Sequence, residues 1–437
     1  MSSNRSHVIG SAIFSLVTIS SQVFAESTET NFSGSARLRY EDSYAKDPTG
    51  ADRVAFTSLR IRPNILVKVN SELSLVLEPQ FAKILGAQVM QPSTATANVG
   101  TDTSGNSTYA GDSFTVFQAY LDMKLEENLN FIGGRQVLKY GDELILGPGD
   151  WGVTGRSFDA LKLRYTNEKA FIDIFDAKIV ENTSANSRAG GDKDLYGIYA
   201  SWNISETIKA FDVYYFYLYD ARDPVLATPA DNGRPAYFSV YGTRWMTAFD
   251  NVSWKFEFAQ NSGAEGTTYV ATNENSKNSM LDTEVGLIVD DSLKTKLSLE
   301  IFRGDANLRE LYPTTAKQLG RTDVVGRRNL TGLGLHYSAG FTDKLILDAD
   351  AYVYQRTSKD NPSYGTDSKT AVGTVASSTS LDIGNEVDLI GKYASSKNLT
   401  WSLGLNFFLP GQYIKDNQGS DSGRVTDYGF FMAETKF

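Results

Sequence analysis

The chain ends with the sequence Tyr428-Gly-Phe-Phe-Met-Ala-Glu-Thr-Lys-Phe437. Its terminal Phe437 falls on the same side of an alternating pattern as Gly429, Phe431 and Ala433. Alternation with a period of two is typical of a β-strand that has one apolar face and one polar face. With an aromatic residue as its last member, this segment resembles the closing strand of a bacterial outer-membrane β-barrel. We therefore predict that it completes a closed sheet.

The first 25 residues have the features of a secretory signal peptide. Arg5 lies in a short polar start, and an apolar stretch runs from Val8 to Phe24. Val23-Phe24-Ala25 then provides small or moderate side chains at the positions expected before a cleavage site. We predict an export signal over residues 1–25 and a single barrel domain over residues 26–437.

Composition excludes several other classes of protein. Mean hydropathy is −0.29, and beyond the signal no stretch reaches the ~18 consecutive apolar residues of a membrane helix. A helical membrane protein is therefore excluded. The net charge of −10 argues against nucleic-acid partners, which favour basic surfaces. The chain has no cysteine, so a small disulfide-stapled scaffold is excluded.

Residues suited to catalysis or metal binding are scarce. Of the two histidines, His7 is removed with the signal, and His336 would have to serve any Ser–His mechanism. We instead expect His336 to face the lumen as an ordinary polar residue. Clusters of His and Cys that could hold zinc are missing from the sequence. We predict a protein that is not an enzyme and that uses no cofactor and no metal.

Alternation recurs along most of the chain and predicts an all-β fold. It is regular at 32–40, 59–67, 73–81, 117–123, 161–165, 196–202, 254–258, 281–289, 297–301, 333–337, 345–353, 387–393 and 399–409, and weaker at 129–140, 170–179, 207–219 and 235–249. Short and long connections alternate between these segments, such as 70–71 followed by 83–113.

This pattern predicts a transmembrane antiparallel up-and-down β-barrel of about 18 strands, with short periplasmic turns and long extracellular loops. An even number of strands places both termini on the periplasmic side. A barrel of ~16–18 strands is wide enough to enclose water. The long loop 83–113 could fold into this lumen and narrow it.

The alternation also predicts which charged side chains face the lumen. Six cationic residues of the early strands point inward, namely Arg37, Arg39, Arg60, Arg62, Lys162 and Arg164. The later strands place Asp282, Glu284, Glu300, Asp348, Asp350, Glu386 and Asp388 inward, with Lys296 and Lys392 among them. One wall is then basic and another mostly acidic, which creates a transverse field.

The four arginines of the first two strands form the strongest candidate for an anion site. Like charges on adjacent strands repel unless a counter-anion or an acidic loop relieves them, and Asp47 and Asp52 could supply part of that relief. Arginine also matches the planar geometry of a carboxylate. The alternative is that these charges pair across neighbouring strands and only keep the barrel wet and rigid.

The stretch from Gly134 to Asp159 stands apart because it is rich in glycine and charge and contains Trp151. Its glycines suit a tight, ordered loop. Arg135 and Arg156 flank this loop, and Arg156 and Asp159 could clamp it to the wall. The alternative is a rigid plug that contacts no solute.

Residues 134–165 resemble the alginate-export family of outer-membrane porins. The residues that carry the resemblance are Arg135, Gly141, Asp142, Trp151, Gly155, Arg156, Phe158 and Asp159. The family implies an 18-stranded barrel with an electropositive constriction that passes a polyuronate outward from the periplasm. It also implies that Arg135, Arg156 and Asp159 line or brace this constriction, that the protein is a monomer, and that periplasmic secretion components are partners.

Taken together, these features predict a porin of the bacterial outer membrane that passes anionic sugars or an alginate-like polyuronate through a charged constriction. Its partners would be the anionic saccharide or small solute and the surrounding outer-membrane lipid and lipopolysaccharide. One alternative is a general diffusion porin for small hydrophilic solutes or organic acids. Another is an adhesin or receptor that acts through its loops.

Overall fold

The computed structural model describes residues 28–44, 53–86, 113–181, 192–220, 236–264, 277–290, 292–367, 370–418 and 425–437. Within them, one antiparallel sheet contains 18 strands, as the alternation predicts. The strands are β1 (Glu29–Tyr44), β2 (Arg53–Lys68), β3 (Leu73–Ile84), β4 (Ser113–Glu126), β5 (Leu129–Gln136), β6 (Phe158–Thr166), β7 (Ala170–Val180), β8 (Lys193–Trp202), β9 (Ile208–Asp220), β10 (Ala236–Phe249), β11 (Val252–Ala264), β12 (Asn278–Asp290), β13 (Thr295–Gly304), β14 (Leu330–Gly340), β15 (Leu345–Arg356), β18 (Asp382–Ala394), β19 (Leu399–Pro410) and β20 (Thr426–Lys436).

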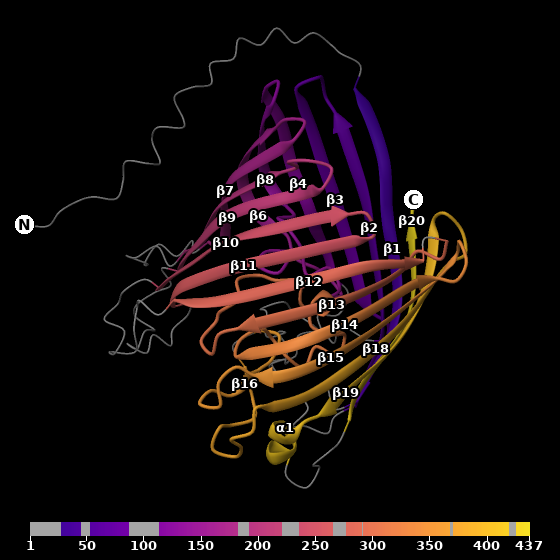
Figure 1. Ribbon diagram of the computed structural model, residues 1–437. Coiled ribbons are helices and arrows are strands. Elements are labelled where there is room, and N and C mark those ends of the chain that lie inside the picture. Colours follow the sequence, from indigo (N-terminus) through magenta and orange to yellow (C-terminus); the bar gives the residue numbers. More distant parts are fainter. Residues whose placement is uncertain are drawn as a thin grey trace, which may run out of the picture.

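The sheet closes on itself because the last strand pairs with the first. β20 runs antiparallel to β1, from the pair Ser35–Lys436 to the pair Tyr44–Asp427. Beyond β20, the Gly34 N–H donates to the Phe437 carbonyl at 2.7 Å, and the Phe437 N–H donates to the Gly34 carbonyl at 3.0 Å. The chain end therefore forms the seam of the barrel (Figure 1). Closure leaves no sheet edge with unpaired backbone groups.

Small elements accompany the barrel. The strands β16 (Ser363–Tyr364) and β17 (Ala371–Val372) form a two-stranded sheet, and the helices are η2 (Thr315–Lys317) and α1 (Gln412–Asn417). Among the described residues, no helix has the length and apolar character to cross a membrane. The predicted signal over residues 1–25, Asp47, Asp52 and most of the loop 83–113 lie outside the described residues.

The two faces of the wall differ as the alternation predicts. Leu161, Leu299 and Leu403 are among the many apolar side chains exposed on the outer face. On the inner face of the same strands, Lys162 and Glu300 are buried inside the barrel. Such a wall suits a barrel with hydrocarbon outside and polar groups within.

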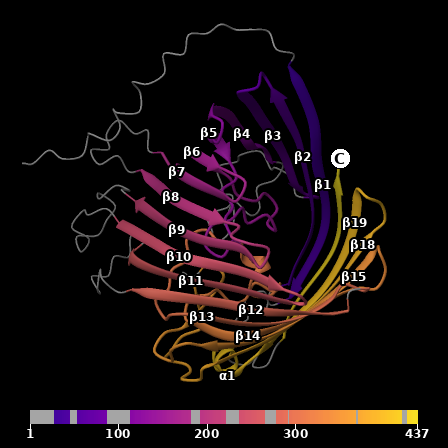
Figure 2. The same ribbon diagram turned by 45° about the horizontal axis from the view of Figure 1, so that its top comes forward.

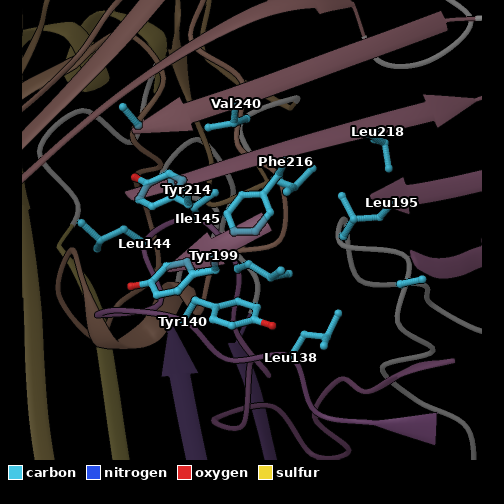
Figure 3. Packing of buried hydrophobic residues seen from close by; sticks show 14 of the residues in the cluster. Leu138, Tyr140, Leu144, Ile145, Leu195, Tyr199, Tyr214, Phe216, Leu218 and Val240 are labelled. Atoms are coloured by element: carbon cyan, nitrogen blue, oxygen red, sulfur yellow. The ribbon is translucent and has the colours of Figure 1, made fainter. Parts of the chain in front are cut away.

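Part of the interior is packed with apolar side chains, which the sequence analysis did not predict. The connection 137–157 between β5 and β6 lies inside the ring of strands (Figure 2). Its residues Leu138, Tyr140 and Leu144 pack in one cluster with Tyr199 and Phe216 of the wall (Figure 3). The rings of Tyr140 and Tyr199 stack with centroids 4.5 Å apart. This cluster fills the β6–β10 side of the lumen and fixes the start of the loop.

The seam gives a first prediction about stability. A methyl group on Gly34 would lie 2.7 Å from the Arg62 carbonyl and 2.7 Å from the Phe437 ring. The ring can move, but the carbonyl belongs to the paired strand β2. Gly34→Ala should therefore destabilise the barrel by about 1–3 kcal/mol, the usual cost of overpacking.

The measurement is the temperature at which the detergent-solubilised protein loses its folded band in semi-native electrophoresis. Gly429→Ala on β20 is the matched control, because its methyl group would have no neighbour closer than 3.8 Å. Equal melting of the two variants would contradict a tightly packed seam.

Candidate functional site

Four arginines line one patch of the inner wall, on the two strands next to the seam. Arg37 lies opposite Arg60 across the β1–β2 pair, and Arg39 and Arg62 lie one inward position away on β1 and β2, respectively. All four are at most 5% exposed. The structure thus brings together the four cations that the alternation placed inward, and we call them the arginine patch.

The arginine patch holds the loop 137–157. Arg37 donates to the carbonyls of Asp150 at 2.9 Å and Gly152 at 2.5 Å. Arg39 donates to the Trp151 carbonyl at 2.7 Å. Because these carbonyls come from consecutive residues, the loop follows the wall closely. The guanidinium groups are therefore engaged by the protein's own backbone.

Asp150 supplies the counter-charge for this patch. Its carboxylate contacts Arg60 at 3.0 Å and Arg62 at 2.7 Å. Burial raises the pKa of Asp150, but the charges of Arg60 and Arg62 oppose this effect, and the resulting pKa lies below its ordinary value of 3.8. The predicted relief of the four like charges thus comes from this loop.

Gly155 permits the close approach of the loop to the patch. It has a φ of 69°, and a methyl group there would lie 2.7 Å from the Arg62 Nη2 atom. Arg62 Nη2 in turn donates to the Thr154 carbonyl at 2.5 Å. A larger residue at this position would adopt a strained backbone conformation, and its side chain would clash with the Arg62 guanidinium group.

A second loop, 305–329, pairs with the first inside the barrel. The Gly147 N–H donates to the Tyr312 carbonyl at 2.9 Å, and the Tyr312 N–H donates to Ile145 at 3.0 Å. Arg156 Nη1 also donates to the Tyr312 carbonyl at 2.8 Å. Arg156 therefore joins the two loops inside the barrel, and its role in lining or bracing a constriction stays a prediction.

The far ends of the paired loops are fixed to other strands. Asp142 of the first loop contacts Arg244 of β10 at 2.8 Å. In the second loop, the Thr322 N–H donates to Glu386 of β18 at 2.8 Å, and the Arg321 N–H donates to Asp388 at 3.0 Å. The two loops together cross the lumen from β1, β2 and the nearby β18 to β10 on the other side.

Two predicted site residues lie on the opposite side of the wall. Arg135 and Asp159 are paired across β5 and β6 at 3.0 Å, with side chains 41% and 60% exposed. Asp159 shares its face of β6 with the exposed Leu161 and Leu163. The prediction that this pair lines or braces the constriction is therefore corrected, because both side chains point away from the lumen.

The remaining two predicted cations lie on the inner face of β6. Lys162 is 7% exposed. Arg164 makes two hydrogen bonds of 2.6 Å with Asp173 of β7. Asp173 also accepts a hydrogen bond from Tyr140 of the first loop at 2.8 Å. Arg164 thus belongs to the support of the apolar cluster and lies apart from the arginine patch.

The two loops and the arginine patch enclose a cavity of about 520 Å³, which we call the basic cavity. Its cationic side chains are Arg37, Arg62, Lys139, Lys317 and Arg321, its anionic side chains are Glu143, Asp150 and Glu434, and its aromatic side chains are Phe117 and Trp151. Lys139, Lys317 and Arg321 come from the loops and were not predicted, because loop residues carry no alternation from which their direction could be read.

A second cavity of about 240 Å³, the acidic cavity, lies on the other side of the paired loops. Its carboxylates are Asp142, Asp282, Glu284, Glu300 and Asp350, and Lys255, His336 and Lys317 also line it. His336 bridges Asp350 at 2.8 Å and Glu300 at 3.1 Å, as a lumen-facing polar residue. Among the described residues, no group of three or more His, Cys, Asp or Glu has a geometry that could hold a metal ion.

Comparison with known proteins gives one family and a set of similar structures. A family model described as alginate export matches residues 28–427. OccK2 (OpdF) of Pseudomonas aeruginosa, solved in complex with glucuronate, has a TM-score of 0.60 at 9% identity and covers 94% of this chain and 98% of its own. OccK8 (OprE) of the same organism has a TM-score of 0.57 at 9% identity, with the same coverage.

OccAB4 of Acinetobacter baumannii has a TM-score of 0.58 at 10% identity and covers 94% of this chain and 98% of its own. At these identities the likeness concerns the fold. No curated protein matches the sequence.

The role of Asp150 leads to a prediction about pH. Because the pKa of Asp150 is lowered while the loop is attached, the ionised carboxylate stabilises this attachment fully above about pH 3.8. The stabilisation is lost as the pH falls through the lower pKa that Asp150 has in the attached loop. Single barrels in planar bilayers should therefore carry a steady current at neutral pH. Transient current steps, caused by the loop leaving the patch, should begin only below about pH 3.8.

Asp150→Asn should show these steps at neutral pH, because Arg60 and Arg62 lose their counter-charge. The Asp150 side chain is 47% exposed, so the free energy that holds the loop to the patch should fall by on the order of 1 kcal/mol. The ratio of detached to attached loop should then rise about fivefold. Asp159→Asn on the outer face is the control and should remain steady. A steady Asp150→Asn current would show that the loop does not depend on this carboxylate.

Proposed function

The chain belongs to the alginate export family and is a channel of the bacterial outer membrane; from this premise we propose that its permeants are carboxylated sugars. The resemblance found in residues 134–165 agrees with this membership. The observation that carries the proposal is the basic cavity, where five cationic side chains face three anionic ones. A monomeric state and contact with periplasmic secretion components stay predictions.

The cations that a solute can reach belong to the loops. In the arginine patch, the donors of Arg37 and Arg39 are directed at loop carbonyls. The side chains of Lys139 and Lys317, in contrast, are 58% and 50% exposed. We therefore assign the arginine patch to holding the loop and the loop cations to contacting the permeant.

Arg321 completes this set. Its guanidinium carbon lies 5.1 Å from the centre of the Trp151 ring, which keeps the side chain at the wall of the basic cavity. Arginine binds a carboxylate through two parallel hydrogen bonds, whereas lysine acts as a point charge. A solute carboxylate in the basic cavity could thus bind the guanidinium group of Arg321 and the ammonium groups of Lys139 and Lys317.

Three further observations favour sugars among carboxylated solutes. The volume of about 520 Å³ lies within the ~300–1,000 Å³ range of small-molecule sites. Phe117 and Trp151 give the cavity apolar surfaces beside its charges. OccK2, which shares the barrel fold, was solved in complex with glucuronate, and the matching family is described as alginate export.

Electrical recordings in planar bilayers test this function. In a gradient of potassium chloride, the reversal potential should show a preference for chloride over potassium. Glucuronate should reduce the current, and glucose at the same concentration should not. Preference for potassium, or equal reduction by glucose, would contradict the proposal. Equal reduction by glutarate would instead widen the permeants to organic acids at large.

Arg321→Met gives the corresponding residue-level prediction. Removing one partly exposed charge should raise the glucuronate concentration for half-maximal block about fivefold, since such a contact is worth on the order of 1 kcal/mol. Arg53→Met is the matched control, because Arg53 pairs with Asp42 at the end of β2 and does not line the cavity. If the two variants behave alike, Arg321 does not contact the permeant.

A further inference from the structure

Glu143 has an unusual position in the first loop. It is only 4% exposed, and its φ of 68° lies in the left-handed region that residues other than glycine rarely adopt. Strained backbone of this kind persists only where surrounding contacts hold it, and it is concentrated at ligand-binding and switching segments. The contacts of Glu143 therefore indicate what the strain serves.

One carboxylate oxygen of Glu143 contacts two lysines. Lys139 Nζ and Lys317 Nζ both lie 3.1 Å from Glu143 Oε1. Burial raises the pKa of Glu143, but hydrogen bonds from Thr314 and Lys317 outweigh this effect and leave the pKa below its ordinary value. The side chain is thus ionised at neutral pH and forms ion pairs with two of the three loop cations, Lys139 and Lys317.

The same residue joins the two loops. The Thr314 N–H donates to the Glu143 carbonyl at 3.0 Å, and Lys317 extends from the second loop to the Glu143 carboxylate. Lys317 also lines both the basic and the acidic cavity. The Glu143–Lys317 contact therefore lies in the partition that separates the two cavities.

We propose that Glu143 is an internal competitor of the permeant, whose carboxylate occupies Lys139 and Lys317 in the empty channel and is displaced when a solute carboxylate binds them. This inference rests on the proposed function of the basic cavity. Displacement removes the ion pair between the two loops and releases the strained backbone. Binding of an anionic solute thus loosens the partition, whereas a neutral sugar leaves it closed.

The key experiment compares glucuronate block in the wild type and in Glu143→Gln. The amide has nearly the same size but no charge, so it competes poorly for the two lysines. If Glu143 occupies the lysines about nine-tenths of the time, its removal lowers the half-blocking concentration about tenfold. Glu181→Gln is the control and should match the wild type, because Glu181 follows β7, pairs with Lys178 at 3.4 Å and lines neither cavity.

A second variant guards against misfolding. Glu143→Asp keeps the charge but shortens the side chain, so the carboxylate reaches the lysines less well. It should lower the half-blocking concentration by a smaller factor than Glu143→Gln. The folded band in semi-native electrophoresis confirms that each variant forms the barrel.

The outcomes separate this inference from the proposed function. Glucuronate block of equal strength in the wild type and both variants would overturn the internal competitor and leave the proposed function standing. Stronger block in Glu143→Gln than in the wild type, with Glu143→Asp in between, would support the internal competitor. Absence of block in all of them would overturn the choice of permeant and the competitor with it.

Discussion

Compensation of the four buried guanidinium groups is the constraint on which the interior of this barrel depends. Like charges on two adjacent strands cannot remain buried without partners. Asp150 and the carbonyls that follow it supply those partners, and this holds the first loop against β1 and β2. The second loop is paired with the first, so its position follows as well. Both cavities exist because the loops are fixed in this way.

A nearby part of the wall, which only β19 and β20 separate from β1, uses the complementary chemistry. Arginines at β1 and β2 donate to loop carbonyls, whereas Glu386 and Asp388 at β18 accept from loop N–H groups. The charges of the wall therefore hold both carbonyl and N–H groups of the loops on this side of the lumen, and Arg244 of β10 holds Asp142 on the far side. A consequence is that charged strand residues act largely as anchors, and the side chains left to meet a solute come from the loops. The net charge of −10 thus says little about the charge of the cavity.

Alternation predicted the 18 strands, the closing role of the last segment and the inward direction of the arginine patch, because the period of two directly encodes the face of each residue. The same rule places Asp159 with Leu161 and Leu163 on the outer face, but its assignment followed the family motif and was wrong. Lys139 and Lys317 could not be placed, since their direction depends on contacts between distant loops. The apolar cluster around Tyr140 was missed for the same reason.

The distribution of contacts also determines where the interior can move. At the wall, several charge-assisted hydrogen bonds to buried arginines hold the first loop, and breaking them would expose buried charge. Between the loops there are neutral backbone hydrogen bonds, the hydrogen bond from Arg156 to the Tyr312 carbonyl and the Glu143–Lys317 contact. Lys317 is half exposed and accessible to solutes. Because an ion pair with a half-exposed partner is individually weak, the Glu143–Lys317 contact should open before either loop leaves the wall. A solute that offers a carboxylate at this junction acts on the least stable connection of the partition.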